Sequence, residues 1–256
     1  MLDIIWILLK DLDDKKRHMP PTLLYNEGWL LRVVLHWFSQ NQLRGHPLSF
    51  QLGAEWYSEG LLTSRFLPMY QGDELAESHT RADGIIGNIS LGKTGKSDVF
   101  LIKPFKQFIV LEAKLFSKLS RGTTRMPGYN QAARNIACMA NVVAQSSCSI
   151  KDFKSLGYYV LAPEAQIKAE PSFTEFMQKE LIYQNVLSRV ESYKKRSDYL
   201  EKQKWFEEHF KPLISKIDLL LISWEELIEK IKKYDNRTGQ ELSQFYSQCL
   251  DFNYSK

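Results

Sequence analysis

The segment around Glu112 has the residue types of a site that handles phosphate. An apolar run over residues 108–111 leads directly into Glu112-Ala113-Lys114, and Asp98 lies upstream with 13 residues between it and Glu112. Side chains alternate between the two faces of a strand, so Glu112 and Lys114 project to the same side. Carboxylates and an ammonium group at the end of a buried strand are costly to desolvate unless they bind something, most simply a hard divalent cation and a phosphate. The pattern predicts a metal-dependent phosphodiesterase.

The elements that would position these residues can be read from hydrophobic periodicity. Apolar residues recur at three and four positions from Leu23 to Trp37, which predicts an amphipathic helix that ends near residues 45–47. A second helix is expected over residues 50–66. Short strands separated by turn sequences are then expected over residues 82–91, 98–102 and 108–114. Further along, we expect a helix over 129–144, a strand over 157–162, charged helices over 172–210, a strand over 216–222 and a helix from Trp224.

This order of elements predicts an α/β fold. The expected core is a central mixed sheet, made of an antiparallel three-strand meander followed by a helix and a further strand, and flanked by helices. We expect one domain, with a core over about residues 20–165 and 213–235. A helical insertion is expected over about 171–212 and a C-terminal helical tail over about 236–256.

Composition sets bounds on the function without choosing one. The 256 residues carry a formal net charge of +4, which permits nucleic-acid binding but does not argue for it. Cys138, Cys148 and Cys249 lie in no paired zinc-site spacing and indicate reduced thiols in a cytoplasmic protein. The apolar stretch over residues 2–9 is interrupted by Asp3, so neither a signal peptide nor a membrane span fits. We interpret it as a docking segment or part of the fold, and expect no membrane partner.

The meander decides which aspartate joins Glu112. With a turn near residues 104–106, Asp98 at the start of one strand falls opposite the end of the next strand, close to Glu112. Asp83 opens the strand before, and folding that strand back through the glycine turn at 92–95 would place it near the opposite end of the sheet. Asp98 is therefore the expected partner, with Asp83 in reserve.

This arrangement resembles the PD-(D/E)XK nuclease superfamily, which has the restriction-endonuclease-like fold. The resemblance covers roughly residues 23–165 and rests on an aspartate that opens the second strand and Glu-x-Lys that closes the third. It implies that Asp98 and Glu112 bind magnesium, with manganese as a substitute, and that the Ala113 carbonyl is a further ligand. It also implies that Lys114 orients or activates the attacking water. Ser97 stands where the motif has proline.

The resemblance also implies supporting residues. Some family members add a glutamate on the helix before the sheet, a place that Glu59 would fill, with Glu27 as its competitor. Some use a glutamine on the helix after the lysine, and Gln131 matches it. Four nearby cations are suited to steering a polyanionic substrate and are the expected nucleic-acid-binding residues: Lys118, Arg121, Arg125 and Arg134.

The sequence thus predicts a magnesium-dependent nuclease, a hydrolase and endonuclease, with DNA favoured over RNA as substrate. The alternative from another class is a non-catalytic nucleic-acid-binding or assembly subunit that retains the nuclease fold. In either case the helices after Ser172 are expected to serve a homodimer or a larger complex. An ion pair at an exposed strand end would explain Glu112-Ala113-Lys114 without catalysis. The run over residues 92–97 ends like a phosphate-binding loop, but Ser90 occupies its first glycine position and a strand follows, which disfavours an NTPase.

Overall fold

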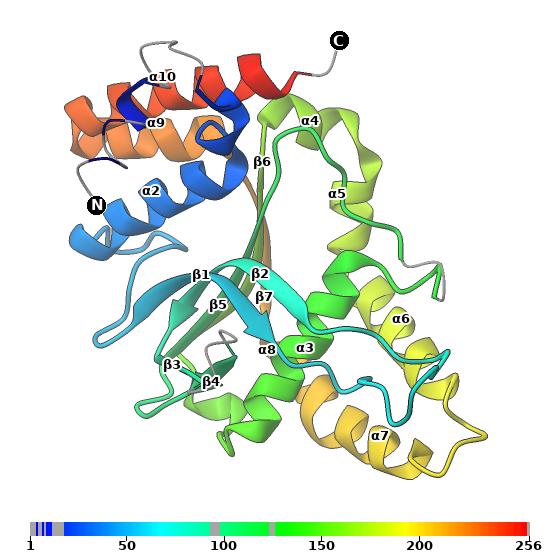
Figure 1. The fold of residues 1–256 in the computed structure, drawn as a ribbon. Helices are drawn as coiled ribbons and strands as arrows, with labels where there is room; N and C mark the ends of the chain where they lie inside the picture. Colours follow the sequence, from blue (N-terminus) through cyan, green and yellow to red (C-terminus); the bar gives the residue numbers. More distant parts are fainter. Residues whose placement is uncertain are drawn as a thin grey trace.

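A five-stranded mixed sheet forms the centre of the structure, a computed structural model that describes residues 4, 7, 9–11, 18–92, 98–122 and 126–254 (Figure 1). The strands lie in the order β1-β2-β5-β6-β7. Their bounds are β1 Glu55–Leu62, β2 Thr80–Gly87, β5 Gln107–Ala113, β6 Ser155–Ala162 and β7 Asp218–Ser223. The first three pair antiparallel, whereas β5, β6 and β7 run parallel. Five residues of the phosphate-loop-like run, 93–97, and most of the N-terminal apolar stretch lie outside the described residues.

One face of the sheet is covered by helices from the two ends of the chain (Figure 1). These are α2 (Glu27–Gln40), α9 (Trp224–Tyr234) and α10 (Asn236–Asn253), with the short helix η1 (Pro21–Leu23) before them. The α2 helix begins where the Asn26 side chain accepts a hydrogen bond from the Trp29 amide at 3.0 Å. It buries a stripe against Ile109 and Leu111 of β5, made of Leu30, Leu31, Val34, Leu35 and Phe38.

The opposite face packs against α3 (Gln131–Gln145), which connects β5 to β6. The Asn130 side chain caps this helix by accepting a hydrogen bond from the Ala133 amide at 2.9 Å. A parallel connection of this kind needs a crossover, and α3 supplies it. The α3 face of the sheet presents alternate residues of β5, namely Phe108, Val110 and Glu112.

A set of helices separates β6 from β7, in the segment where the helical insertion was expected. They are α4 (Glu164–Ala169), α5 (Pro171–Phe176), α6 (Lys179–Glu191), α7 (Tyr199–Trp205), the π-helical η3 (Phe206–Phe210) and α8 (Lys211–Lys216). A one-turn helix, η2 (Ile150–Asp152), precedes β6. Figure 1 shows α6, α7 and α8 on the same side of the sheet as α3, and their apolar residues belong to one core with it. The α/β class and the helices and strands expected after residue 128 are therefore confirmed.

The helix expected over residues 50–66 is wrong, because this segment contains β1. Trp56 and Tyr57 favour a strand, and β1 pairs with β2 along its length. Gly60 has a positional reason in that strand, since a Cβ atom there would lie 2.5 Å from the Ile85 Cδ1 atom. The spacing of apolar residues was compatible with both periods over so short a run.

The expected meander is also wrong in its connectivity. The chain leaves the sheet after Gly87 and forms a separate two-stranded hairpin, β3 (Ile89–Leu91) with β4 (Val99–Leu101), which the Ile102 amide closes by donating to the Asn88 carbonyl at 2.9 Å. It then returns as β5, which pairs directly with β2. Gly87 permits this close return, because a Cβ atom there would lie 2.5 Å from the Gln107 carbonyl oxygen. The strand expected over 82–91 is thus two strands.

Two further observations concern the cysteines and the described helices. Cys138, Cys148 and Cys249 are free thiols. No helix within the described ranges is both long and apolar enough to cross a membrane.

A buried ion pair ties the loop between β1 and β2 to the insertion. The Arg196 guanidinium donates to both carboxylate oxygens of Asp73, at 2.6 and 3.1 Å. These hydrogen bonds lower the pKa of Asp73 to about 2. The stabilisation they provide is therefore complete above pH ~4 and is lost as the pH falls towards 2.

We expect Arg196→Met to lower the free energy of unfolding by about 3 kcal/mol at pH 7, because it leaves the Asp73 carboxylate buried without its partner. Urea unfolding followed by circular dichroism measures this change. The matched control is Arg237→Met, which removes an exposed helical ion pair to Glu241 and should stay within about 0.5 kcal/mol of the wild type. Equal effects of the two substitutions would contradict a role for the Asp73 pair in the fold.

Candidate active site

Three carboxylates lie in one row across β1, β2 and β5. In the β1–β2 register, the residues on either side of Glu59 pair with those on either side of Asp83. In the β2–β5 register, Gly84 pairs with Leu111, so Asp83 is level with Glu112 on the next strand. The row therefore reads Glu59, Asp83, Glu112 from the edge of the sheet inward.

Asp83 occupies the middle of this row and is held to β5. Its Oδ2 atom accepts a hydrogen bond from the Ala113 amide at 2.8 Å. The pKa of Asp83 is raised to about 7, mainly by burial and also by the negative charges of Glu112 and Glu59, against the opposing effects of the Ala113 hydrogen bond and the Lys114 charge. Two carboxylates that resist simultaneous ionisation are a pair that a cation would stabilise.

Glu112 is buried, with 4% of its surface exposed, and three donors surround its carboxylate. Lys114 Nζ lies 2.7 Å from Oε1, and Gln131 Nε2 donates to the same oxygen at 2.7 Å. Asn135 Nδ2 donates to Oε2 at 3.2 Å and lies equally close to the Tyr158 hydroxyl. A buried carboxylate needs such donors, and these hold it in one orientation.

Lys114 is positioned through its backbone as well as its side chain. Its amide donates to the Leu161 carbonyl of β6 at 2.8 Å, and its own carbonyl accepts from Trp224 Nε1 of α9 at 2.8 Å. The Lys114 side chain is 12% exposed. The ammonium group therefore lies where both the buried carboxylate and a substrate from solvent can reach it.

Glu59 belongs to the rim of the site and comes from a strand, not from the helix that was expected. Its φ of 60° is in the left-handed region and interrupts the β1–β2 pairing at this residue. The Arg81 guanidinium donates to the Glu59 carbonyl at 3.1 Å, and Arg32 Nη2 lies 3.5 Å from its carboxylate. The Glu59 side chain is 48% exposed, so it is free to turn towards a ligand.

Asp98 does not join Glu112, which corrects the geometry expected from the meander. Its backbone forms a bridge with Leu61 on the outer edge of β1, and its carbonyl accepts from the Gly92 amide at 2.8 Å. The strands β1 and β2 therefore lie between Asp98 and β5. The physical reason is the hairpin excursion of β3 and β4, which carries Asp98 to the outer edge of β1 and leaves β2, with Asp83, as the neighbour of β5.

The remaining expected residues are dispersed. Glu27 lies at the start of α2, where its charge acts on Cys249 of α10, away from the carboxylate row. Lys118 is exposed and forms an ion pair with Glu170 at 2.7 Å, and Arg121 is exposed. Arg125 lies outside the described residues. Arg134 lies one helical turn from Gln131 and lines a pocket with it.

Sequence reasoning missed Asn135 and ranked Asp83 second. Asn135 had a usable signal, because it lies four residues after Gln131 and so on the same face of the helix. Asp83 had none that outweighed Asp98, because its neighbour in space is decided by the long-range return of β5. Both Asp83 and Asp98 precede a short apolar run, so the local sequence does not distinguish them.

Asp83 and Glu112 are the two protein carboxylates that could hold a hard divalent cation at this site. Both would supply oxygen ligands, and the pKa of Asp83 is raised first by burial and then by the nearby Glu112 charge. Within the part of the chain that the structure describes, no group of three or more His, Cys, Asp or Glu side chains is arranged to hold a metal ion. Magnesium usually keeps several waters and takes one or two carboxylates, so two suffice.

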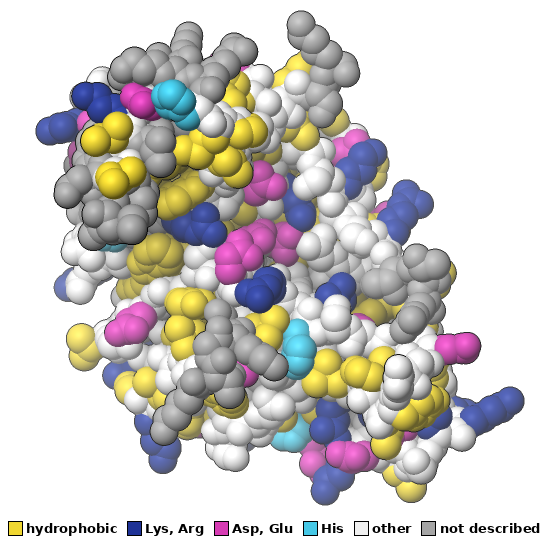
Figure 2. Space-filling view, viewed as in Figure 1, with side chains coloured by type: hydrophobic (Ala, Val, Ile, Leu, Met, Phe, Trp, Pro, Cys, Tyr) yellow, Lys and Arg dark blue, Asp and Glu magenta, His cyan; other side chains and the backbone are white. Residues whose placement is uncertain are grey.

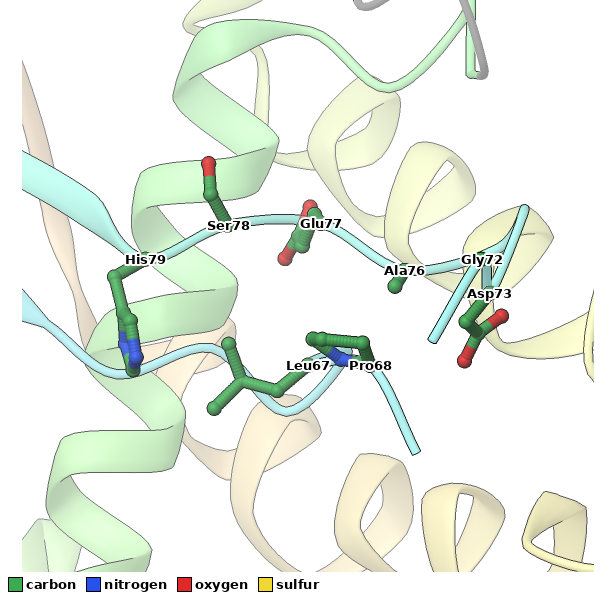
Figure 3. A pocket seen from close by; sticks show the side chains of 8 residues that line it. All are labelled: Leu67, Pro68, Gly72, Asp73, Ala76, Glu77, Ser78 and His79. Carbon is green, nitrogen blue, oxygen red and sulfur yellow. The ribbon is translucent and has the colours of Figure 1, made fainter. Parts of the chain in front are cut away.

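The surface near the middle of one face of the molecule carries both acidic and basic side chains. Figure 2 shows acidic side chains gathered near the centre of this face, with Lys and Arg side chains beside them. A pocket of about 550 Å³ lies away from the carboxylate row, in the loop between β1 and β2 (Figure 3). Its labelled side chains include Glu77 and Asp73, which serve buried contacts with Ser64 and Arg196. We therefore place the candidate active site at the carboxylate row.

A search among protein-family models, curated proteins and solved structures finds no match for this chain.

The raised pKa of Asp83 predicts how the stability of the metal-free protein depends on pH. Because the pKa is higher in the folded protein than the unperturbed value of 3.8, the ionised form is disfavoured by folding. The stability is fully present below pH ~4 and falls as the pH rises through 7. Asp83→Asn should therefore match the wild type at pH 4 and exceed it at pH 8 by up to about 4 kcal/mol in EDTA.

Urea unfolding in EDTA across this pH range measures the difference. Magnesium added at pH 8 should raise the melting temperature of the wild type and leave that of Asp83→Asn unchanged. If the difference in unfolding free energy between the two proteins does not vary with pH, the pKa of Asp83 is not raised.

Proposed function

We propose that this chain is a magnesium-dependent nuclease with a restriction-endonuclease-like core, which hydrolyses phosphodiester bonds of nucleic acid and prefers DNA to RNA. One observation carries the proposal: Asp83 and Glu112 lie side by side on β2 and β5, and Lys114 Nζ lies 2.7 Å from the Glu112 carboxylate. Asp83 takes the role that the sequence had suggested for Asp98. Ala82 then stands where the family motif has proline.

The arrangement of elements supports the same proposal. An antiparallel pair carries the aspartate on β2 and Glu-x-Lys at the end of β5, a helix follows, and the next strand is parallel. The helix α3 returns Gln131 to the Glu112 carboxylate, which supports the proposed role of this glutamine.

Asp83 and Glu112 would hold the magnesium ion, and the Ala113 carbonyl stays a predicted third ligand. Bound there, the ion would neutralise the phosphate, lower the pKa of the attacking water and stabilise the leaving oxygen. Glu59, at the exposed end of the row, is placed to bind a water on the metal side of the site.

The protein's own groups orient the reaction. Lys114 donates a hydrogen bond to the attacking water or to a phosphate oxygen, where water is scarce and a charge has a large effect. Gln131 and Asn135 keep the Glu112 carboxylate facing the metal position. Lys118, Arg121, Arg125 and Arg134 are proposed to attract the nucleic-acid backbone. The proposed compartment is the cytoplasm, where the free thiols would stay reduced.

Cleavage assays on plasmid, linear duplex, single-stranded DNA and RNA test the function. We expect cleavage in magnesium or manganese and none in EDTA. Asp83→Asn and Lys114→Met should each lower the rate by at least about 100-fold, because each removes a group that acts on the reacting phosphate or its metal. Asp98→Asn is the matched control and should keep the rate within about twofold.

Three outcomes would count against the proposal. Cleavage that survives both Asp83→Asn and Lys114→Met would exclude this site. Loss of cleavage in Asp98→Asn alone would return the role to Asp98. Nucleic-acid binding without cleavage in either metal would instead support a binding subunit that retains the fold.

Gln131 offers a separate test of orientation. We expect Gln131→Met to lower kcat by about tenfold with little change in KM, because one of three donors to the Glu112 carboxylate is lost while the cationic side chains proposed to bind the substrate remain. Steady-state kinetics on an oligonucleotide duplex measures both. A change confined to KM would place Gln131 in substrate binding instead.

A further inference from the structure

A small pocket opens beside the carboxylate row, between the start of β2, the loop after β5 and the first turns of α3. Its volume is about 210 Å³, the space of about seven water molecules at ~30 Å³ each. The residues that matter in its lining are Arg81, Ser120, Tyr129, Gln131, Arg134 and Asn135. This volume accommodates one phosphate group with a few waters and is small for a whole nucleotide.

The pocket shares a wall with the active site. Gln131 and Asn135 line the pocket and also donate hydrogen bonds to the two oxygens of the Glu112 carboxylate. A group bound in the pocket would therefore be separated from Glu112 by the thickness of one amide side chain. That places it next to the scissile phosphate, and not at it.

The charge of the lining is positive. Arg81 and Arg134 contribute two guanidinium groups, and no Asp or Glu lines the pocket within the described residues. Arg81 is exposed, and its Nη1 atom donates a hydrogen bond to the Glu59 backbone carbonyl. Because this carbonyl carries no net charge, the contact does not compensate the positive charge of Arg81. Glu77 lies close enough to Arg134 to interact with its charge, so Arg134 is partly compensated.

Several polar atoms of the lining lack partners. Within the described part of the chain, Arg134 Nε, the Tyr129 hydroxyl and Asn135 Oδ1 are buried without any hydrogen bond. A buried donor left without an acceptor costs free energy, and for a charged donor the cost is larger. The Arg134 Nε atom is closed to solvent, so an anion in the pocket would offset this cost through its charge near the guanidinium group and not through a contact with Nε.

We propose that this pocket binds a phosphate group of the substrate strand, adjacent to the phosphate that is cleaved. This inference rests on the proposed nuclease function for the identity of the strand, but not for the binding of phosphate itself. The phosphate comes either from within a continuous strand or from a phosphorylated end. An end-bound phosphate would make cleavage depend on the terminal group.

The first experiment uses inorganic phosphate and does not depend on cleavage. In EDTA, saturating phosphate should raise the melting temperature of the wild type by at least about 2 °C. Arg81→Gln and Arg134→Gln should each reduce this shift, whereas Arg237→Gln, an exposed substitution on α10, should keep it. Arg81 is exposed, so its variant remains informative if Arg134→Gln fails to fold. No shift in the wild type, or a shift that survives both substitutions, would overturn the pocket and leave the nuclease proposal intact.

The second experiment identifies the source of the phosphate. Cleavage kinetics compare a duplex with 5′-phosphate ends, the same duplex with 5′-hydroxyl ends and a covalently closed circle. Arg81→Gln should raise KM by about tenfold on whichever substrate fills the pocket, and kcat should stay within twofold. The slope of the logarithm of the binding constant against the logarithm of the salt concentration should fall by about the value of one phosphate contact. An effect on all three substrates identifies an internal phosphate, and an effect confined to 5′-phosphate ends identifies a terminal one. If the wild type binds phosphate but cleaves no substrate, the result supports the phosphate pocket and refutes the nuclease function. If Arg81→Gln cleaves every substrate with an unchanged KM, the result refutes the assignment of the pocket to a phosphate of the substrate strand.

Discussion

The burial of the Glu112 carboxylate is the constraint on which the site depends. A carboxylate that is 4% exposed needs donors at fixed positions, and the chain supplies three of them from two segments. Lys114 comes from the same strand, and Gln131 and Asn135 come from the helix that crosses over the sheet. The crossover helix must therefore begin close to the end of β5, which in turn places its first turns beside β2. Packing of the α3 face and the chemistry of the site follow from this one requirement.

A second requirement comes from the β2–β5 pairing, because it decides which aspartate meets Glu112. Gly87 lets β2 and β5 approach closely where the chain leaves the sheet, and the β3–β4 hairpin absorbs the residues between them. If β4 had been the neighbour of β5, Asp98 would have met Glu112. The position of one glycine and the length of one excursion thus matter as much as the identity of the acid.

Sequence reasoning reached the parts of the fold that depend on local patterns. Clear hydrophobic periods mark the strand before Glu112 and the later parallel strands, and a clear period with a capping residue marks the helix after residue 130. The structure contains all of these elements. The segment with Trp56 and Gly60 is a strand because of its partner β2, which a local period does not reveal. In the site, the shared side of Glu112 and Lys114 followed from alternation along a strand, whereas the place of Gln131 followed only from the family resemblance. The neighbour of Glu112 on the next strand followed from neither, because strand pairing is a tertiary choice made over a long loop. The catalytic and binding roles of all these residues stay predictions.

The hydrogen bond from Trp224 to the Lys114 carbonyl joins residues 110 positions apart in the chain. All three carboxylates of the row and both amides on α3 are synthesised long before Trp224 emerges from a ribosome. Contacts of such long sequence separation form late because the closure of a long loop opposes them. A partly made chain thus contains every acidic group of the row while the ammonium group still lacks one of its two backbone anchors. Completion of β7 and α9 is therefore what separates a chain with the right residues from a chain with an assembled site.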